Sequence, residues 1–504
     1  MQSLLRDYFS ATATGLLIAL SLPPFWWHGL IWIAFVPLLA ALDGKDRSAG
    51  LRIGAVAGGV GYAAAYAWLP PSIAAFFGFP GELVVAAFVA FVFWHALHFS
   101  LFGIIVRGQW TGGARIAAPA LVWVVVEAFF PTLFPFFIGN ALQPHVPFIQ
   151  LAALTGVAGL SFAILLCNAL VFEAWRNFRT GGRPLIPLML ALAVIVGLDL
   201  YGRWQLRGVD AAEVAPRKSI VLVQGNVEAR RETSEAWVRE SLRTYSRLTT
   251  EAARLHPDLI VWPELSVRAS LPGDGVVMQR VFEIARQADT VLFIGAGNRD
   301  ESGGAGNAAF LISPYGDVLG VYKKRRMLPF AEETPSLVGL LRGGPRSGAL
   351  RADTTSLIIP GGRMAPSICY EATFPAFFRD GVNDGADFLV NISNDVWFGD
   401  TAGPYHHLQA AVMRAVETRR WLVRATNSGV SAVVDAHGRV VARTQLFERT
   451  VLHADVPLLE GGSLYLRWGD WFLATCAAAL AALWLVGSFG IRSAKNEARR
   501  VSAR

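Results

Sequence analysis

Two apolar regions enclose a polar one in this chain. Residues 1–205 and 470–491 are made of long apolar runs, whereas residues 206–465 carry most of the charge. A helix needs roughly 20 mostly apolar residues to cross the hydrocarbon core of a bilayer. The mean hydropathy of +0.41 and the charged fraction of 16% agree with this division, since soluble proteins average about 25% charged residues. We therefore expect a membrane part that carries a domain folded in water.

Eight apolar runs are candidates for membrane-spanning helices. Seven precede the polar region and one follows it: residues 9–22, 26–42, 51–69, 83–106, 115–132, 147–174, 185–201 and 471–490. The first run is short and is followed by Pro23-Pro24, and a cleaved signal peptide is the alternative for it. We disfavour that alternative because no small-residue cleavage site follows the run.

The loop charges predict the orientation of these helices. Lys and Arg lie at the N-terminus, in alternate loops and in the tail: Arg6, Lys45, Arg47, Arg107, Arg176, Arg179, Arg183 and residues 492–504. The loops between them, such as "PPFWWHG" and "PTLFPFFIGNALQPH", contain neither. By the positive-inside rule both termini are cytoplasmic and the polar region lies on the other side, in a bacterium the periplasm. The expected location is a bacterial cytoplasmic (inner) membrane.

Three domains follow from this division. Residues 1–205 form a transmembrane domain of about seven helices, residues 206–465 a periplasmic domain, and residues 466–504 a C-terminal transmembrane helix with a cytoplasmic tail. The formal net charge of +7 does not indicate nucleic-acid binding, because many of the Arg residues lie in short loops and in the tail, where they orient the helices. The three cysteines, two of them inside apolar runs, do not form a disulfide framework.

Short apolar runs alternate with amphipathic stretches in residues 206–465. The runs are typical of strands: residues 219–227, 258–264, 290–298, 308–314, 364–371, 387–395, 421–429 and 430–438. Amphipathic helices are expected at 234–255, 275–288 and 404–420. Runs that are apolar on both faces predict a sheet covered on both sides, so we expect a layered α/β domain.

Polar residues gather at the ends of these predicted strands. Glu264 ends "LIVWPE", Cys369 ends "MAPSIC", and the paired lysines Lys323 and Lys324 lie between them in "YKKRRMLPFAEE". A nucleophilic cysteine needs a base and a cation that favours its thiolate, and Glu with Lys supply both. The backbone N–H of Tyr370 is a candidate donor to an oxyanion. The alternative is that Cys369 is a small buried hydrophobic residue.

Four motifs resemble those of a known family. "WPE" at 262–264, a Lys before "LPFAEE", "ICYE" at 368–371 and "NISNDVWFGD" at 391–400 together are similar to the nitrilase superfamily. With seven spans before them and one after, they resemble its membrane-embedded branch, the apolipoprotein N-acyltransferases. The resemblance implies an α-β-β-α sandwich beside a multi-span helical membrane domain. The family usually has Gly before the Glu of "FAEE", where this chain has Ala331.

The resemblance also implies residue roles. Glu264 matches the general base and Cys369 the nucleophile, while Lys324 rather than Lys323 matches the family lysine because it precedes Glu332 by eight residues. The residues that match supporting positions are Glu332, Tyr370, Glu371 and, with a poorer alignment, Trp237.

The implied reaction is acyl transfer through a thioester on Cys369. A phospholipid gives the acyl chain, and the acceptor is the N-terminal α-amine of the diacylglyceryl-cysteine of an apolipoprotein. Because both substrates are anchored in the bilayer, Trp397, Phe398 and the segment 336–344 with Leu340 are candidates for a lipid-facing lid; ordinary core packing is the alternative for them. The sequence implies no cofactor and gives no sign of an oligomer.

Two other functions stay open at this point. One is a membrane-tethered amidase or nitrile hydrolase that uses the same three residues with water as acceptor. The other is a transporter or receptor with a non-catalytic binding domain, against which the spans show no set of broken helices with paired charges. A metal at His406-His407 is disfavoured, because neighbouring side chains on a helix do not converge.

Overall fold

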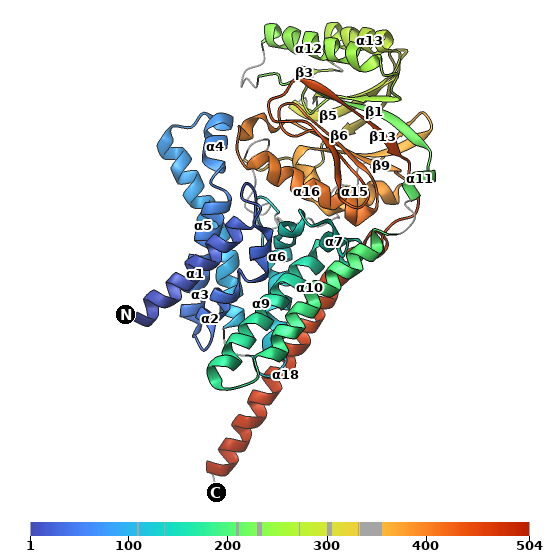
Figure 1. Cartoon of the computed structure of the whole chain (residues 1–504). Coiled ribbons are helices and arrows are strands. Elements are labelled where there is room, and N and C mark those ends of the chain that lie inside the picture. The colour runs from blue at the N-terminus through green and yellow to red at the C-terminus, as the bar shows by residue number, and fades with distance from the viewer. Residues whose placement is uncertain are drawn as a thin grey trace.

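The computed structural model describes residues 2–502 apart from several short stretches and one longer one. The residues not described are 1, 108–109, 136, 208–210, 229–233, 272, 300–304, 331, 333–354 and 503–504. The described chain forms a bundle of helices with an α/β domain at one end of it (Figure 1). The long C-terminal helix returns along the bundle, so that both chain ends lie on the side away from the α/β domain (Figure 1).

The N-terminal residues and the C-terminal helix build the bundle. Its elements are α1 (Gln2–Leu20), η1 (His28–Trp32), α2 (Val36–Leu42), α3 (Arg47–Ala65), α4 (Leu69–Phe77), α5 (Gly81–Val106), α6 (Ala114–Phe129), η2 (Ile138–Leu142), α7 (Val146–Ile149), α8 (Ala152–Thr155), α9 (Val157–Thr180), α10 (Leu185–Gln205) and α18 (Trp471–Ser502). Within the described residues, α5, α9 and α10 are long and apolar enough to cross a membrane.

Two of the predicted spans are wrong as continuous helices. The run 26–42 forms η1 and the short α2, and the run 147–174 is divided into α7, α8 and most of α9. The break between α8 and α9 occurs at Gly156, whose φ of 66° lies in the left-handed region that a regular helix does not use. A Cβ at Gly156 would also lie 2.6 Å from the ring of Tyr465. The apolar composition indicated a continuous span and not this break.

A line of glycines lets two helices of the bundle approach closely. Gly50, Gly54 and Gly58 of α3 are four residues apart and face α5. A Cβ at Gly54 would lie 2.3 Å from the carbonyl oxygen of Phe99. Small residues at such positions let membrane helices pack through their backbones.

Two sheets face each other in the α/β domain. The first has the order β13-β1-β2-β4-β5-β6, with β3 paired to β4, and the second has the order β12-β11-β10-β9-β8-β7. The strands are β1 (Arg217–Gln224), β2 (Leu259–Val261), β3 (Val267–Ser270), β4 (Val291–Arg299), β5 (Ala305–Ile312), β6 (Val318–Lys323), β7 (Leu357–Ile359), β8 (Gly362–Ile368), β9 (Phe388–Ser393), β10 (Leu422–Thr426), β11 (Ala432–Val434), β12 (Val440–Arg443) and β13 (Thr450–Pro457).

Helices cover the outer face of each sheet. One core joins α12 (Glu235–Ala253) and α13 (Gly275–Ala288) to the first sheet, and another joins α15 (Pro375–Asn383) and α16 (Gly403–Thr418) to the second. A third core lies between the sheets. The layers are therefore α-β-β-α, and the predicted fold class is confirmed. The shorter helices are α11 (Ala211–Val214), η3 (Cys369–Thr373), η4 (Asp395–Phe398) and α17 (Leu464–Trp468).

The strands that the sequence did not predict are mostly the edges of the sheets. All eight predicted strands are present, whereas β6, β7, β12 and β13 end the two sheet orders and β3 lies off the path. Exposed and half-buried residues alternate along β12, whereas β9 is buried throughout. An edge strand is only partly covered, so it lacks the continuous apolar run by which the inner strands were found.

The α/β domain contacts the bundle through the helices that cover its second sheet. Helices α15 and α16 face the bundle, while α12 and α13 lie on the far side (Figure 1). Gln409 of α16 donates to the carbonyl oxygen of Asn140 at 2.8 Å. Glu417 accepts a hydrogen bond from the backbone N–H of Val157 at 3.2 Å.

Candidate active site

Glu264, Lys324 and Cys369 come from the ends of three strands. Glu264 lies three residues after β2, and Lys324 directly follows β6 of the same sheet. Cys369 directly follows β8, which belongs to the facing sheet. The two sheets therefore bring together residues that are 45 and 60 positions apart in the chain.

Lys324 is held between two carboxylates. Its Nζ donates to Glu264 Oε1 at 2.9 Å and to Glu332 Oε1 at 2.7 Å. The side chains of Lys324 and Glu264 are only 1% and 5% exposed. Burial alone would lower the pKa of Lys324, but the carboxylates of Glu264 and Glu332 outweigh it and raise the pKa. Lys324 is therefore a cation at neutral pH.

Asn307 is a member of this cluster that the sequence analysis did not single out. Its Nδ2 donates to Glu264 Oε1 at 2.7 Å and approaches Glu332 Oε1 at 3.3 Å. The other oxygen of Glu264 accepts from the backbone N–H of Asn394 at 3.0 Å. No motif pointed to Asn307, because its place beside the carboxylates depends on the pairing of β5 with β6.

Cys369 occupies a strained backbone position. Its φ of 52° is left-handed, which non-glycine residues adopt at an energetic cost. Burial raises the pKa of the Cys369 thiol, the Glu264 carboxylate raises it further, and the Lys324 ammonium opposes both. The thiol is therefore neutral at rest, and its proton must be removed when it reacts.

Glu371 connects the turn at Cys369 to the segment that carries Lys324. It is fully buried and accepts hydrogen bonds from Ile368 N at 2.8 Å, Arg325 N at 2.5 Å and Arg326 N at 3.0 Å. The hydroxyl of Tyr322 donates to it at 2.8 Å. Burial raises the pKa of Glu371, and these donors oppose that increase.

Tyr370 links the site to the helical bundle. Its hydroxyl donates to the carbonyl oxygen of Leu133, and its ring lies edge-on to Phe134 with centroids 6.2 Å apart. The backbone N–H of Leu133 in turn lies 3.2 Å from Nε2 of His95, inside α5. A loop of the bundle is thus held against the residue that follows Cys369.

The aromatic candidates Trp237, Trp397 and Phe398 contact the guanidinium of Arg268 or residues of the bundle. Arg268 lies 5.3 Å from the ring centroid of Trp237 and 5.8 Å from that of Trp397. Trp397 and Phe398 are half-buried and contact bundle residues: Trp397 meets Phe76 at 5.0 Å and Phe398 meets Trp68 at 5.2 Å between centroids.

Trp237 itself is buried, and its indole N–H donates to the carbonyl oxygen of Glu228 at 2.8 Å. Leu340 and the rest of the segment 336–344 lie outside the described residues.

The two adjacent histidines face different partners. The ring of His406 lies against Tyr66 and Trp68 of the bundle. His407 instead places Nε2 3.0 Å from the carbonyl oxygen of Cys369. No role beside Cys369 was predicted for His407, because only the packing of α16 beneath the second sheet brings it to the turn at Cys369.

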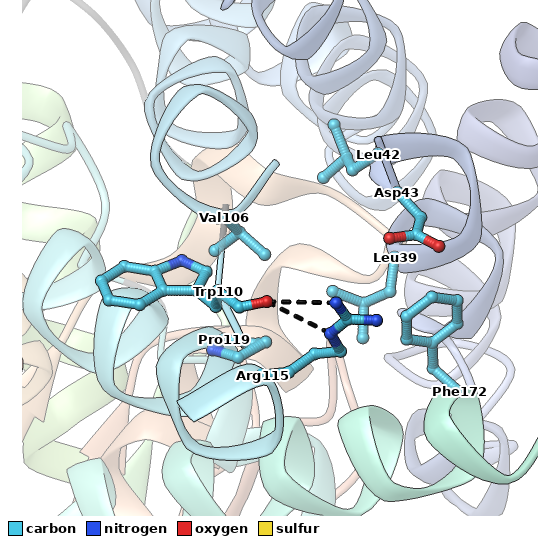
Figure 2. A pocket seen from close by; sticks show the side chains of 8 residues that line it. All are labelled: Leu39, Leu42, Asp43, Val106, Trp110, Arg115, Pro119 and Phe172. Atoms are coloured by element: carbon cyan, nitrogen blue, oxygen red, sulfur yellow. Dashed lines mark hydrogen bonds between the residues drawn. The ribbon is translucent and has the colours of Figure 1, made fainter. Parts of the chain in front are cut away.

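A small pocket lies in the bundle, away from these residues. It is lined by Leu39, Leu42, Asp43, Val106, Trp110, Arg115, Pro119 and Phe172 (Figure 2). Arg115 reaches across it and donates from Nε and Nη2 to the carbonyl oxygen of Trp110, both at 3.2 Å. None of its lining residues belongs to the α/β domain, so it is separate from the candidate active site.

Residues 222–464, which hold the sandwich and its cluster of Glu, Lys and Cys, match the Carbon-nitrogen hydrolase family model and so form a domain of the carbon–nitrogen hydrolase class. Residues 14–170 match the Apolipoprotein N-acyltransferase N-terminal domain. A protein of Geobacter metallireducens named apolipoprotein N-acyltransferase is 34% identical over 493 residues, which cover 94% of each chain. One of the same name from Azotobacter vinelandii is 35% identical over 93% of each. The chain belongs to the apolipoprotein N-acyltransferase family.

Among solved structures, an amidase from Nesterenkonia sp. aligns with 54% of this chain and 97% of its own, at 19% identity and a TM-score of 0.38. The family membership decides between the functions left open by the sequence. The protein is a membrane-bound enzyme, an N-acyltransferase, and neither a transporter nor a receptor.

Proposed function

We propose that this enzyme transfers an acyl chain from a phospholipid to the N-terminal α-amine of the diacylglyceryl-cysteine of an apolipoprotein, through a thioester on Cys369. The observation that carries the proposal is the buried Glu264–Lys324 pair whose charges act on the Cys369 thiol, in a domain seated on a bundle of apolar helices. The relatives act on apolipoproteins according to their names.

In the first half-reaction Glu264 takes the proton of the Cys369 thiol. The sulfur then attacks the ester carbonyl of the phospholipid, and an S–C bond forms. The ester C–O bond breaks, and the lysophospholipid leaves with the proton that Glu264 held. A base is required because burial keeps the resting thiol neutral.

Lys324 and a backbone N–H stabilise the negative oxygen of the tetrahedral intermediate. Lys324 is charged and fixed by two carboxylates, so it needs no reorganisation when charge develops. The second donor is the N–H of Tyr370. Glu332 holds Lys324 in place and Asn307 holds Glu264, and Glu371 fixes the nucleophile turn.

In the second half-reaction the α-amine of the acceptor attacks the thioester. Glu264 accepts a proton from the amine, a C–N bond forms, and the S–C bond breaks. The proton returns to the sulfur, the product is an amide, and the kinetics are ping-pong.

The aromatic contacts between the two parts of the chain have a role in this scheme. Moving an acyl chain from lipid to water costs about 0.8 kcal/mol per CH₂. A route from the bilayer to Cys369 must therefore be apolar. Trp397 and Phe398, which lie against Phe76 and Trp68, line that route, and Trp237 supports it through Arg268. The same apolar lining keeps water from the thioester.

The proposed location is the cytoplasmic membrane of a bacterium. Residues 206–465 lie in the periplasm and both termini in the cytoplasm, because Lys and Arg occupy the loops on the side of the termini. Both chain ends lie at the end of the bundle opposite the α/β domain (Figure 1). This position supports the proposed orientation.

Intact-mass measurement tests the thioester directly. The purified enzyme, incubated with phosphatidylethanolamine vesicles and no acceptor, should gain the mass of one acyl chain and lose it on treatment with neutral hydroxylamine. The matched control, Cys369→Ala, should stay unmodified. An adduct that persists in Cys369→Ala, or an unmodified wild-type enzyme after prolonged incubation, contradicts the proposal.

A further inference from the structure

The carbonyl oxygen of Cys369 is held by a histidine that the reaction scheme above does not use. His407 lies on α16, 38 residues after the nucleophile, with its Nε2 3.0 Å from that oxygen. A carbonyl oxygen can only accept a hydrogen bond, so Nε2 must carry the proton. The side chain is 7% exposed, which makes this contact part of the interior.

The ring of His407 is itself fixed from its other nitrogen. Nδ1 lies 3.0 Å from Asp395 Oδ1 and 3.0 Å from Arg424 Nη2. Arg424 Nη2 also donates to Asp395 Oδ2 at 2.8 Å, and both of those side chains are fully buried. Whether Nδ1 donates to Asp395 or accepts from Arg424, Nε2 keeps its proton and the ring keeps its plane.

Asp395 is an anion at neutral pH in this cluster. Burial alone would raise the pKa of Asp395, but Arg424 and His407 outweigh it and hold the pKa well below its usual range. The hydroxyl of Ser393 also donates to it at 2.7 Å. A buried carboxylate with these partners gives His407 one stable orientation.

The hydrogen bond at the carbonyl oxygen of Cys369 also restrains the backbone N–H of Tyr370. The C=O of Cys369 and the N–H of Tyr370 belong to the same planar trans peptide, in which the two groups point in opposite directions. Fixing the oxygen therefore fixes the direction of the N–H. The left-handed φ of Cys369 makes such a restraint necessary, because surrounding contacts must hold a strained residue in place.

We propose that His407 is a positioning residue for the oxyanion hole: by donating to the carbonyl oxygen of Cys369, it aims and polarises the N–H of Tyr370 at the developing oxyanion. The inference rests on the proposed function, since that N–H is one of its two oxyanion donors. No proton leaves His407 during the reaction. A hydrogen bond at the carbonyl also strengthens the N–H of the same peptide as a donor.

This role distinguishes two reactions of the same thiol. Acylation by an ester passes through a tetrahedral oxyanion, whereas alkylation by iodoacetamide forms an S–C bond with loss of iodide and no oxyanion. A group that serves the oxyanion should therefore affect acylation alone. A group that serves the thiol or the fold should affect both reactions.

The experiment compares His407→Asn with His407→Gln in the full-length enzyme. The amide of Asn reaches the position of Nδ1, and the amide of Gln reaches that of Nε2, so Gln alone keeps a donor to Cys369. Acylation is measured as the burst of p-nitrophenol from p-nitrophenyl butyrate, a small ester that needs no phospholipid. Alkylation is measured with iodoacetamide by intact mass.

The expected result is a burst rate about 10- to 100-fold lower in His407→Asn and within about threefold of wild type in His407→Gln. This is less than the 10²- to 10³-fold that follows complete loss of an oxyanion donor. Alkylation should stay within about twofold in both. His406→Asn, which removes the neighbouring histidine from the same helix, is the control and should leave both rates near wild type.

Three outcomes would overturn the inference: an unchanged burst in His407→Asn, an equal fall in burst and alkylation, or no rescue by Gln. Failure of the proposed phospholipid donor is seen separately. In that case the wild-type enzyme gives a burst with the small ester but gains no acyl mass from phospholipid vesicles.

Discussion

Lys323 and Lys324 are neighbours in the chain with opposite surroundings. Lys323 is exposed at the end of β6, whereas Lys324 is buried between Glu264 and Glu332. Successive side chains of a strand point to opposite faces, so a shift of one residue would place the wrong lysine at the site. The family resemblance, through the spacing to Glu332, predicted Lys324, and this is the lysine that contacts both carboxylates.

Lys324→Ala should lower the rate of thioester formation by about 10²- to 10³-fold, because it removes a charged donor to the oxyanion. It should also lower the free energy of unfolding by about 3–5 kcal/mol, since Glu264 loses its buried cation. The measurements are the burst rate with p-nitrophenyl butyrate and thermal unfolding in detergent. Lys323→Ala is the matched control and should change the rate less than twofold. If the two variants exchanged their effects, the assignment of the lysine would be wrong.

At the scale of elements, the close approach of α3 to α5 depends on glycines, which have only a hydrogen atom where other residues have a Cβ. Gly54 faces the backbone of Phe99, while Gly59 of the same helix has no atom within 4 Å of an added Cβ. The two glycines therefore make a matched pair for measuring what close packing contributes to the bundle.

Gly54→Ala should destabilise the bundle by about 1–3 kcal/mol, the usual cost of overpacking, because its Cβ would lie 2.3 Å from the Phe99 oxygen. Gly59→Ala should leave stability unchanged or slightly higher, since Ala favours helix over Gly. Thermal unfolding of both proteins in the same detergent measures the difference. Equal melting temperatures would mean that the two helices can move apart at no cost.

The sequence pattern of a strand also depends on how much of the strand is covered. Inner strands such as β9 are covered on both faces, so their sequence is apolar throughout. Edge strands such as β12 alternate in burial and carry a weaker pattern, so the sequence predicted the interior of each sheet and missed its edges.

At the scale of the whole molecule, the position of the active site follows from how the α/β domain sits on the bundle. Tyr370 reaches Leu133, and Trp397 and Phe398 reach α4. The turn at Cys369 is therefore next to the helical bundle, as the proposed reaction between two lipid-anchored substrates requires.

The proposed orientation can be measured with two reporters. Alkaline phosphatase fused near residue 300 should be active, because it folds only after export. The same enzyme fused after residue 504 should be inactive there, whereas a fluorescent protein at that position should be bright. The reverse pattern would mean that the loop charges do not set the orientation of this chain.

The division into apolar and polar regions, the inner strands, and the candidates Glu264 and Cys369 at the ends of strands could be predicted from local patterns: the length of an apolar run and its periodicity. The choice of Lys324 over Lys323 came from the resemblance to the nitrilase superfamily. The break at Gly156 and the positions of Asn307, His407 and Leu133 follow from the tertiary structure alone. Their contacts join segments 38 to 237 residues apart, and such contacts depend on strand register and helix packing, which no local pattern encodes.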